Sequence, residues 1–167
     1  MKKRNFIILS SMICTFLFLL ISYVIFSIKY GEHVRVSSKI EIKIPLSAKL
    51  ENNDSHGGFH GDGESLSKVY FNVEQAHNIE NEINANKHWK KLPMPERLQN
   101  CVSLYAEEGM NMPIVENGYW FYLDRHSEAD NKYDENERYE EKRASRNYSV
   151  AVFDTDENIL YYYELDT

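Results

Sequence analysis

The feature that most constrains this chain is an uncharged apolar stretch of 23 residues, Phe6 to Ile28, close to its start. As an α-helix with a rise of ~1.5 Å per residue, such a stretch spans the ~30 Å hydrocarbon core of a bilayer. A cleaved signal peptide is the alternative, but its apolar region has only ~7–15 residues and ends in small residues. Here the run is longer and is followed by Lys29-Tyr30-Gly31. We therefore interpret it as a retained signal anchor, a single transmembrane helix.

The charges that flank this helix predict its orientation. Lys2, Lys3 and Arg4 precede it and favour a cytoplasmic amino terminus. Basic residues also follow it, so the bias is nearly balanced, and the shortness of the leading tail decides for the N-in, C-out orientation. The predicted location is the cell membrane, with residues 1–31 as tail and transmembrane helix (about 6–28) and residues 32–167 as one extracytoplasmic domain.

The predicted domain is strongly acidic. Residues 32–167 carry 15 Lys and Arg against 26 Asp and Glu, a net charge of −11. Such a domain repels phosphate backbones, so we expect no nucleic-acid partner, and attraction to a cation or a basic partner fits better. Of the two cysteines, Cys14 lies in the apolar stretch and Cys101 in a predicted helix, so no disulfide is expected.

Periodicity predicts the elements of the domain. Val34–Ile44 alternates apolar and polar residues, which predicts a strand, and Leu66–Val73 predicts a second one. The pattern then changes to helical spacing from Glu74 onward, and a second helix is expected after Pro95. We predict residues 47–64 as a loop.

The last third of the domain predicts more strands. Tyr119–Leu123 is apolar on both sides, as in a strand covered on both faces. Tyr148–Phe153 and Ile159–Leu165 flank a polar turn and predict a hairpin. The predicted fold is α+β: an N-terminal transmembrane helix, then one domain with a mostly antiparallel sheet of about five strands and two helices on one face.

One loop carries residue types that suggest chemistry. Between His56 and Glu64 it holds four of the seven glycines of the chain, two histidines and two carboxylates. Histidine and carboxylate at short spacing are ligands of zinc and other transition metals. The candidate metal ligands are His56, His60 and Asp62, with His126 joining them if its loop is a neighbour.

A purely structural interpretation of this loop stays open. Glycines at this density also serve a tight turn, and the two histidines can simply hydrogen-bond the loop. The spacing matches neither HExxH nor paired CxxC. No catalytic set is recognisable, which favours a non-enzymatic protein, and we predict no cofactor apart from a possible divalent metal. The acidic stretch Glu128–Glu141 is expected to be a solvated loop.

Three stretches together resemble a group of bacterial proteins. They are His56-Gly57-Gly58-Phe59-His60-Gly61-Asp62-Gly63, Gly118-Tyr119-Trp120-Phe121 with Asp124-Arg125-His126-Ser127, and Leu160-Tyr161-Tyr162-Tyr163-Glu164-Leu165-Asp166-Thr167. The chain is similar to small, membrane-anchored or lipoprotein-like, uncharacterised proteins of low-GC Gram-positive bacteria, over most of residues 54–167. The resemblance implies an outward-facing domain and draws attention to both histidine loops, and it assigns no catalytic residue.

These observations lead to three functional hypotheses. The first is a single-pass membrane protein whose acidic extracytoplasmic domain binds a ligand or a protein partner at the cell surface. The alternative is a metal-binding protein or metal-dependent hydrolase that uses the loop of residues 56–64 and His126. The third is a membrane-side scaffold or immunity-type protein that recruits a partner through its acidic loop.

Overall fold

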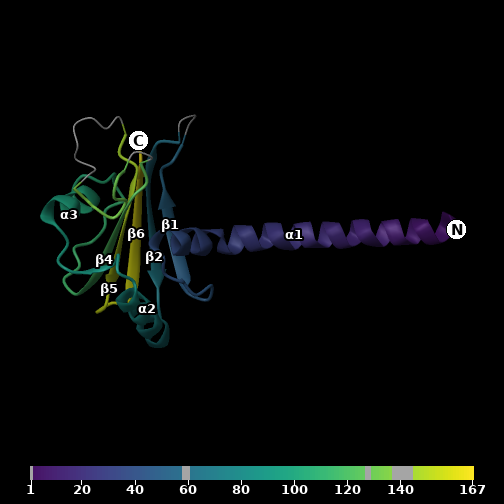
Figure 1. Cartoon of the computed structure of the whole chain (residues 1–167), viewed down its shortest axis with the longest axis horizontal. Coiled ribbons are helices and arrows are strands. Elements are labelled where there is room, and N and C mark those ends of the chain that lie inside the picture. The colour runs from purple at the N-terminus through teal and green to yellow at the C-terminus, as the bar shows by residue number, and fades with distance from the viewer. Residues whose placement is uncertain (1, 58–60, 127–128, 137–144) are drawn as a thin grey trace.

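The computed structural model describes residues 2–57, 61–126, 129–136 and 145–167, with side chains from Ile8 onward. A long helix leads into a single antiparallel sheet that carries two shorter helices (Figure 1). The elements in chain order are α1 Lys2–Ile40, β1 Lys49–Asp54, β2 Gly63–Tyr70, α2 Val73–Ala85, β3 Lys90–Lys91, α3 Glu96–Ser103, β4 Gly118–Asp124, β5 Tyr148–Asp154 and β6 Ile159–Asp166.

The helix α1 is uninterrupted over 39 residues. Its large apolar side chains from Ile8 to Ile28 are exposed, and the helix from Ile8 to Ile40 is long and apolar enough to cross a membrane. A helix that has already formed extends without a new nucleation cost, and the first proline after the apolar stretch is Pro45. The helix therefore continues beyond the predicted anchor and ends at Ile40, directly before Glu41, whose backbone is left-handed (φ 60°).

The prediction of a strand over Val34–Ile44 is wrong, and burial shows why. His33, Val36 and Ile40 are buried, at the i, i+3, i+7 spacing of one helix face. Val34, which the strand would have buried, is 50% exposed. The alternation misled because Val36 and Ile40 fit a period of two as well as a helical stripe.

The sheet has six strands in the order β1-β2-β6-β5-β4-β3, and every neighbouring pair is antiparallel. The predicted α+β class, the β5–β6 hairpin and the strand at Tyr119–Leu123 are confirmed. Two strands were not predicted. β1 lies in the supposed loop 47–64 because it is polar and mostly exposed, and β3 has only two residues.

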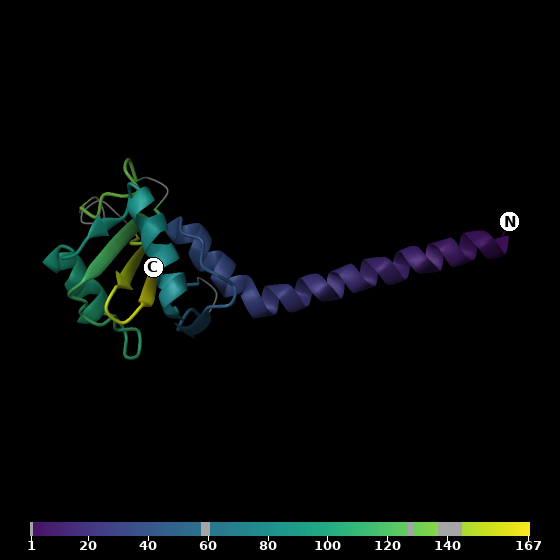
Figure 2. The ribbon, with the colours of Figure 1, turned by 90° about the horizontal axis from the view of Figure 1, so that it is seen from below.

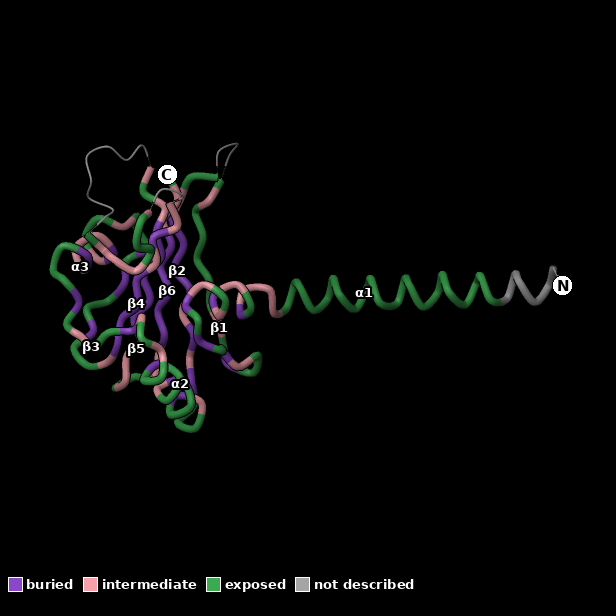
Figure 3. The backbone as a smooth tube through the Cα atoms, viewed as in Figure 1, coloured by how far each residue is buried: buried purple, intermediate pink, exposed green. Residues whose placement is uncertain are grey.

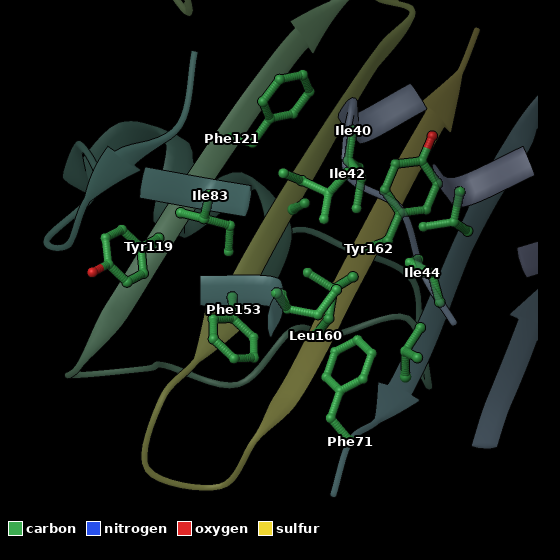
Figure 4. Packing of buried hydrophobic residues seen from close by; sticks show 14 of the residues in the cluster. Ile40, Ile42, Ile44, Phe71, Ile83, Tyr119, Phe121, Phe153, Leu160 and Tyr162 are labelled. Carbon is green, nitrogen blue, oxygen red and sulfur yellow. The ribbon is translucent and has the colours of Figure 1, made fainter. Parts of the chain in front are cut away.

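The two faces of the sheet have separate cores. Along β4, Tyr119 and Phe121 belong to the first core, whereas Trp120 and Tyr122 belong to the second. Figure 4 shows the first core, where Ile40 of α1 lies close to Ile42 and Tyr162. Figure 3 shows burial concentrated along the central strands.

The helices α2 and α3 lie on opposite faces, so the prediction that both cover one face is wrong. The first core contains Ile79 and Ile83 of α2, and the second contains Leu98 and Val102 of α3. The reason is the short strand β3, which lies between the two helices in the chain and pairs at the sheet edge. The chain turns around this edge, and the end of α1 occupies the rest of the first face.

The end of α1 crosses the strands instead of following them (Figures 1 and 2). Glu32 accepts a hydrogen bond from Ser67 on β2 (2.7 Å), and Arg35 pairs with Glu164 on the next strand, β6. Farther along, the carbonyl of Ile40 accepts a bond from Trp89 (3.0 Å), next to β3. One helical turn rises ~5.4 Å and strands lie ~4.8 Å apart, so successive turns meet successive strands.

Candidate functional site

The predicted metal ligands gather at one end of the sheet. His56 follows β1, Asp62 precedes β2 and His126 follows β4, and the antiparallel pairing brings these strand ends together. His60 lies outside the described residues. His126 is a candidate only on the condition that its loop is a neighbour of the His56 loop. The contacts between His56 and the end of β4 show whether this condition is met.

His56 lies between two carboxylates. Its Nδ1 atom is 2.6 Å from Oδ1 of Asp54, which also accepts the backbone N–H of His56 (2.9 Å). Its Nε2 atom is 3.2 Å from Oδ2 of Asp166 near the end of β6. These hydrogen bonds lead to Asp54 and Asp166, not to Asp62, and they fix the orientation of the imidazole ring.

Asp166 joins the two loops. Its second oxygen, Oδ1, is 2.8 Å from Nη1 of Arg125, which directly precedes His126. His126 itself donates its backbone N–H to Asp124 (2.9 Å). Among the described residues, no group of three or more His, Cys, Asp or Glu side chains is arranged to hold a metal. The metal site of His56, His60, Asp62 and His126 stays a prediction, because His60 is not described.

The contacts extend from this end of the sheet to α1. Glu164, whose side chain is only 5% exposed, pairs with Arg35 of α1 and with Arg125 (3.1 Å). Arg35 is held in turn by Glu32, one helical turn earlier, at 2.7 Å. We call this set the charged cluster: Glu32, Arg35, Asp54, His56, Arg125, Glu164 and Asp166.

Both guanidinium groups of the charged cluster make contacts beyond their ion pairs. Arg125 also donates to the carbonyl of Leu165 (2.9 Å), and the Arg35 guanidinium lies 5.4 Å from the centre of the Tyr162 ring. Guanidinium groups that bridge carboxylates form strong, charge-assisted hydrogen bonds. The cluster is thus suited to fastening α1 to the loops.

Two opposing effects act on the pKa of Asp54. Partial burial works to raise the pKa, but the hydrogen bonds from the backbone and the side chain of His56 outweigh it and lower the pKa below its ordinary value. Asp54 is therefore an ionised acceptor at neutral pH and holds the start of the glycine-rich loop.

Sequence reasoning did not find the charged cluster. Arg35 and Glu164 are 129 residues apart in the chain, and Arg35 was assigned to a strand. One signal was present: Glu164 follows Leu160 and Tyr162 at a spacing of two, so the three side chains share one face of an apolar strand. A carboxylate at such a position needs a cationic partner.

A cavity of about 260 Å³ lies on the opposite face of the sheet. Its polar groups include Glu64, the last acid of the predicted loop motif, and the exposed side chain of Arg146. Cys101 also faces it, half-buried on α3. The full lining is Glu64, Cys101, Tyr105, Arg146, Tyr148, Tyr163 and Leu165.

The floor of this cavity is a buried polar group among aromatic rings. Glu64 is 8% exposed and accepts the backbone N–H of Glu107 (2.8 Å). Burial, then the neighbouring Tyr148 and Glu64, raise the pKa of Tyr163 far above its usual value. Tyr163 therefore stays protonated and donates hydrogen bonds within the cavity.

The chain matches no protein-family model, no curated protein and no solved structure with which it was compared. The fold and the geometry of these groups are therefore the basis for the function proposed below.

Proposed function

We propose that this chain is a single-pass membrane protein that carries a ligand-binding domain on the outer side of the membrane. The observation that carries the proposal is the continuity of α1. The helix is apolar and exposed from Ile8 to Ile28, and it is buried in the domain at Val36 and Ile40. One rigid element thus serves as both the anchor and a part of the domain core.

The proposal includes the N-in, C-out orientation, which the basic residues before the apolar stretch favour and those after it oppose. Protease treatment of sealed vesicles that contain the full chain tests it. A protected fragment of helix size, with digestion of the domain in right-side-out vesicles, supports the proposal. Protection of the whole domain in those vesicles would reverse the orientation, and release of the protein by alkaline carbonate would overturn the anchor.

The cavity at Glu64 supports ligand binding. A buried carboxylate beside the rings of Tyr148 and Tyr163 favours a small ligand with a protonated amine, because the carboxylate and the ring faces both attract a cation. Exposed Tyr105 and Arg146 lie at the rim, where they contact the remainder of such a ligand. The net acidity of the domain attracts cationic molecules from solution.

A thermal-shift screen of small primary and quaternary amines against the full chain in detergent micelles tests this assignment. We expect at least one amine to raise the melting temperature, and Glu64→Gln to abolish the shift. Glu51→Gln, an equivalent change at an exposed carboxylate on β1, serves as the matched control. Equal shifts in both variants, or no shift with any amine, would contradict the ligand class.

Divalent-metal binding is the second candidate function. The observation that favours it is the short contact between Nδ1 of His56 and Asp54 (2.6 Å), since a carboxylate at one ring nitrogen commonly orients a metal-binding histidine. A metal would then bind at Nε2, in place of the longer contact to Asp166 (3.2 Å). Elemental analysis of the purified full chain tests it, with His56→Gln and His126→Gln for comparison. Near-stoichiometric metal that is lost in these variants supports a site shared by the two loops. Protein without metal after incubation with zinc would contradict it.

A further inference from the structure

The direction in which α1 crosses the sheet fixes which edge lies nearest the apolar segment. Glu32 contacts Ser67 on β2, which also bonds Asn52 on the edge strand β1 (3.0 Å). Ile40, two turns later, lies beside Trp89 near the opposite edge. The order from β1 to β3 therefore runs along the helix, away from the apolar segment, as Figure 3 shows.

The distance from the apolar segment to β1 is short. Glu32 follows Ile28 by four helical residues, a rise of about 6 Å. The headgroup layer on each side of the hydrocarbon core is about 5–8 Å thick. With Ile28 at the hydrocarbon boundary, Glu32 and the strand β2 that it contacts lie within or directly above the headgroups. β1 lies one strand spacing nearer the apolar segment and therefore within the headgroup layer.

The strand β1 has the composition of a surface that fits this layer. Its six residues, Lys49 to Asp54, are mostly exposed and include charges of both signs and two asparagines. Among the described strands β1 pairs with β2 alone, so its outer edge presents backbone N–H and C=O groups. Phospholipid headgroups and their water offer hydrogen-bond partners for both kinds of group. Lys29 and Tyr30, which directly follow the apolar stretch, are residue types that suit the same interface.

An open sheet edge normally invites pairing with another chain. A second copy cannot reach this one, because a strand added to β1 in the plane of the sheet would lie on the side of the apolar segment, inside the bilayer. The remaining candidate to cover the outer edge of β1 is the membrane surface.

We propose that the β1 edge rests on the phospholipid headgroup layer, so that the membrane covers the open edge of the sheet and holds the strands parallel to its surface. The inference rests on the proposed membrane anchor and adds a docking surface for lipid headgroups. It places the opposite edge, β3, about five strand spacings or ~24 Å farther from the membrane.

Spin labels on the full chain in phospholipid vesicles test the proposal. Cys14 and Cys101 are first replaced by serine. Single nitroxides are then attached through Glu51→Cys on β1, Lys91→Cys on β3 and Phe18→Cys in the apolar segment. All three side chains are exposed, and Lys49→Cys provides a second position on β1 if the first variant folds poorly.

The readout is the relaxation enhancement caused by nickel chelated to lipid headgroups. We expect a severalfold larger enhancement at position 51 than at position 91, with position 18 reached by oxygen and shielded from soluble nickel. If position 18 lies in the bilayer and positions 51 and 91 respond equally, the docking of β1 is overturned while the anchor stands. If position 18 is reached by soluble nickel, the anchor itself fails.

Discussion

Removing the charge of Glu164 should destabilise the domain, because this carboxylate links α1 to the end of β4. Its side chain is 5% exposed and lies between the guanidinium groups of Arg35 and Arg125. Glu164→Gln keeps the size and shape of the side chain and removes only the negative charge. Two cationic groups then face a neutral amide in a largely buried place.

The structure sets the size of the effect. Breaking a buried ion pair on one side costs about 3–5 kcal/mol. Here Arg125 keeps Asp166, Arg35 keeps Glu32, and the Arg35 side chain is 34% exposed. These remaining partners and solvent screening reduce the expected loss in the free energy of unfolding to about 2–3 kcal/mol.

Urea unfolding of the full chain in nonionic detergent measures this loss. Both tryptophans of the chain, Trp89 and Trp120, are buried in the domain, so their fluorescence reports domain unfolding without interference from the anchor. With a denaturant slope of about 2 kcal/mol/M, the midpoint should fall by about 1 M.

Two further variants make the result interpretable. Glu51→Gln removes an exposed partner of Lys49 and should leave the urea midpoint nearly unchanged. The double variant Arg35→Gln with Glu164→Gln should lose less than the sum of its single changes. A midpoint for Glu164→Gln equal to that of Glu51→Gln would refute the argument that the cluster fastens α1.

Three other changes test separate parts of the structure. Val36→Ala should cost about 2 kcal/mol by leaving a cavity where α1 meets the sheet, whereas Val34→Ala, at a half-exposed position, should cost little in the same urea titration. Gly118→Ala should cost more than about 2 kcal/mol, because its Cβ would lie 1.9 Å from a backbone oxygen of the neighbouring strand at a φ of 143°; wild-type stability would mean that β4 and β5 are paired differently. The hydrogen bond from Tyr133 to Glu41 raises the pKa of Tyr133 to about 12, so its contribution to stability should fall as pH rises from 10 through 12. Glu41→Gln should return that pKa towards 10 in an NMR titration of labelled tyrosine, and an unchanged pKa would contradict the contact.

If the β1 edge rests on lipid, the two loops and the cavity take definite places. The strands then run parallel to the membrane surface, and the end of the sheet that carries His56 points sideways along it. A ligand at Glu64 is bound on the face opposite α1, where the core helix does not obstruct access. Ligand binding and membrane attachment are thereby separated onto different surfaces of one small domain.

The elements that were predicted correctly are those whose signal is local. The hairpin of β5 and β6 has an apolar run on each side of a polar turn, and β4 is apolar on both sides because both of its faces are covered. Helix α2 has Ala76, Ile79 and Ile83 on one side, and all three are buried. In each case neighbouring residues report the environment directly, so distant contacts are not needed.

The candidate site was predicted only in part. The sequence indicated that the loops around His56 and His126 are special, and the structure brings these loops together through Asp166 and Arg125. The sequence did not indicate Asp54 or Asp166 as the partners of His56. Side chains from strands far apart in the chain meet only when the sheet forms, and no local spacing encodes that meeting.

The sequence by itself determined that this chain has a membrane-length helix, an acidic α+β domain and a mostly antiparallel sheet, because hydropathy, charge and periodicity are local properties. Only the tertiary structure decided whether the residues that follow the apolar stretch form a strand or a helix. Val36 and Ile40 fit both the strand pattern and the helix pattern. The helix is favoured because it buries both side chains against one face of the sheet. That choice makes the apolar helix continuous with the core of the domain, and it sets which edge of the sheet lies nearest the apolar segment.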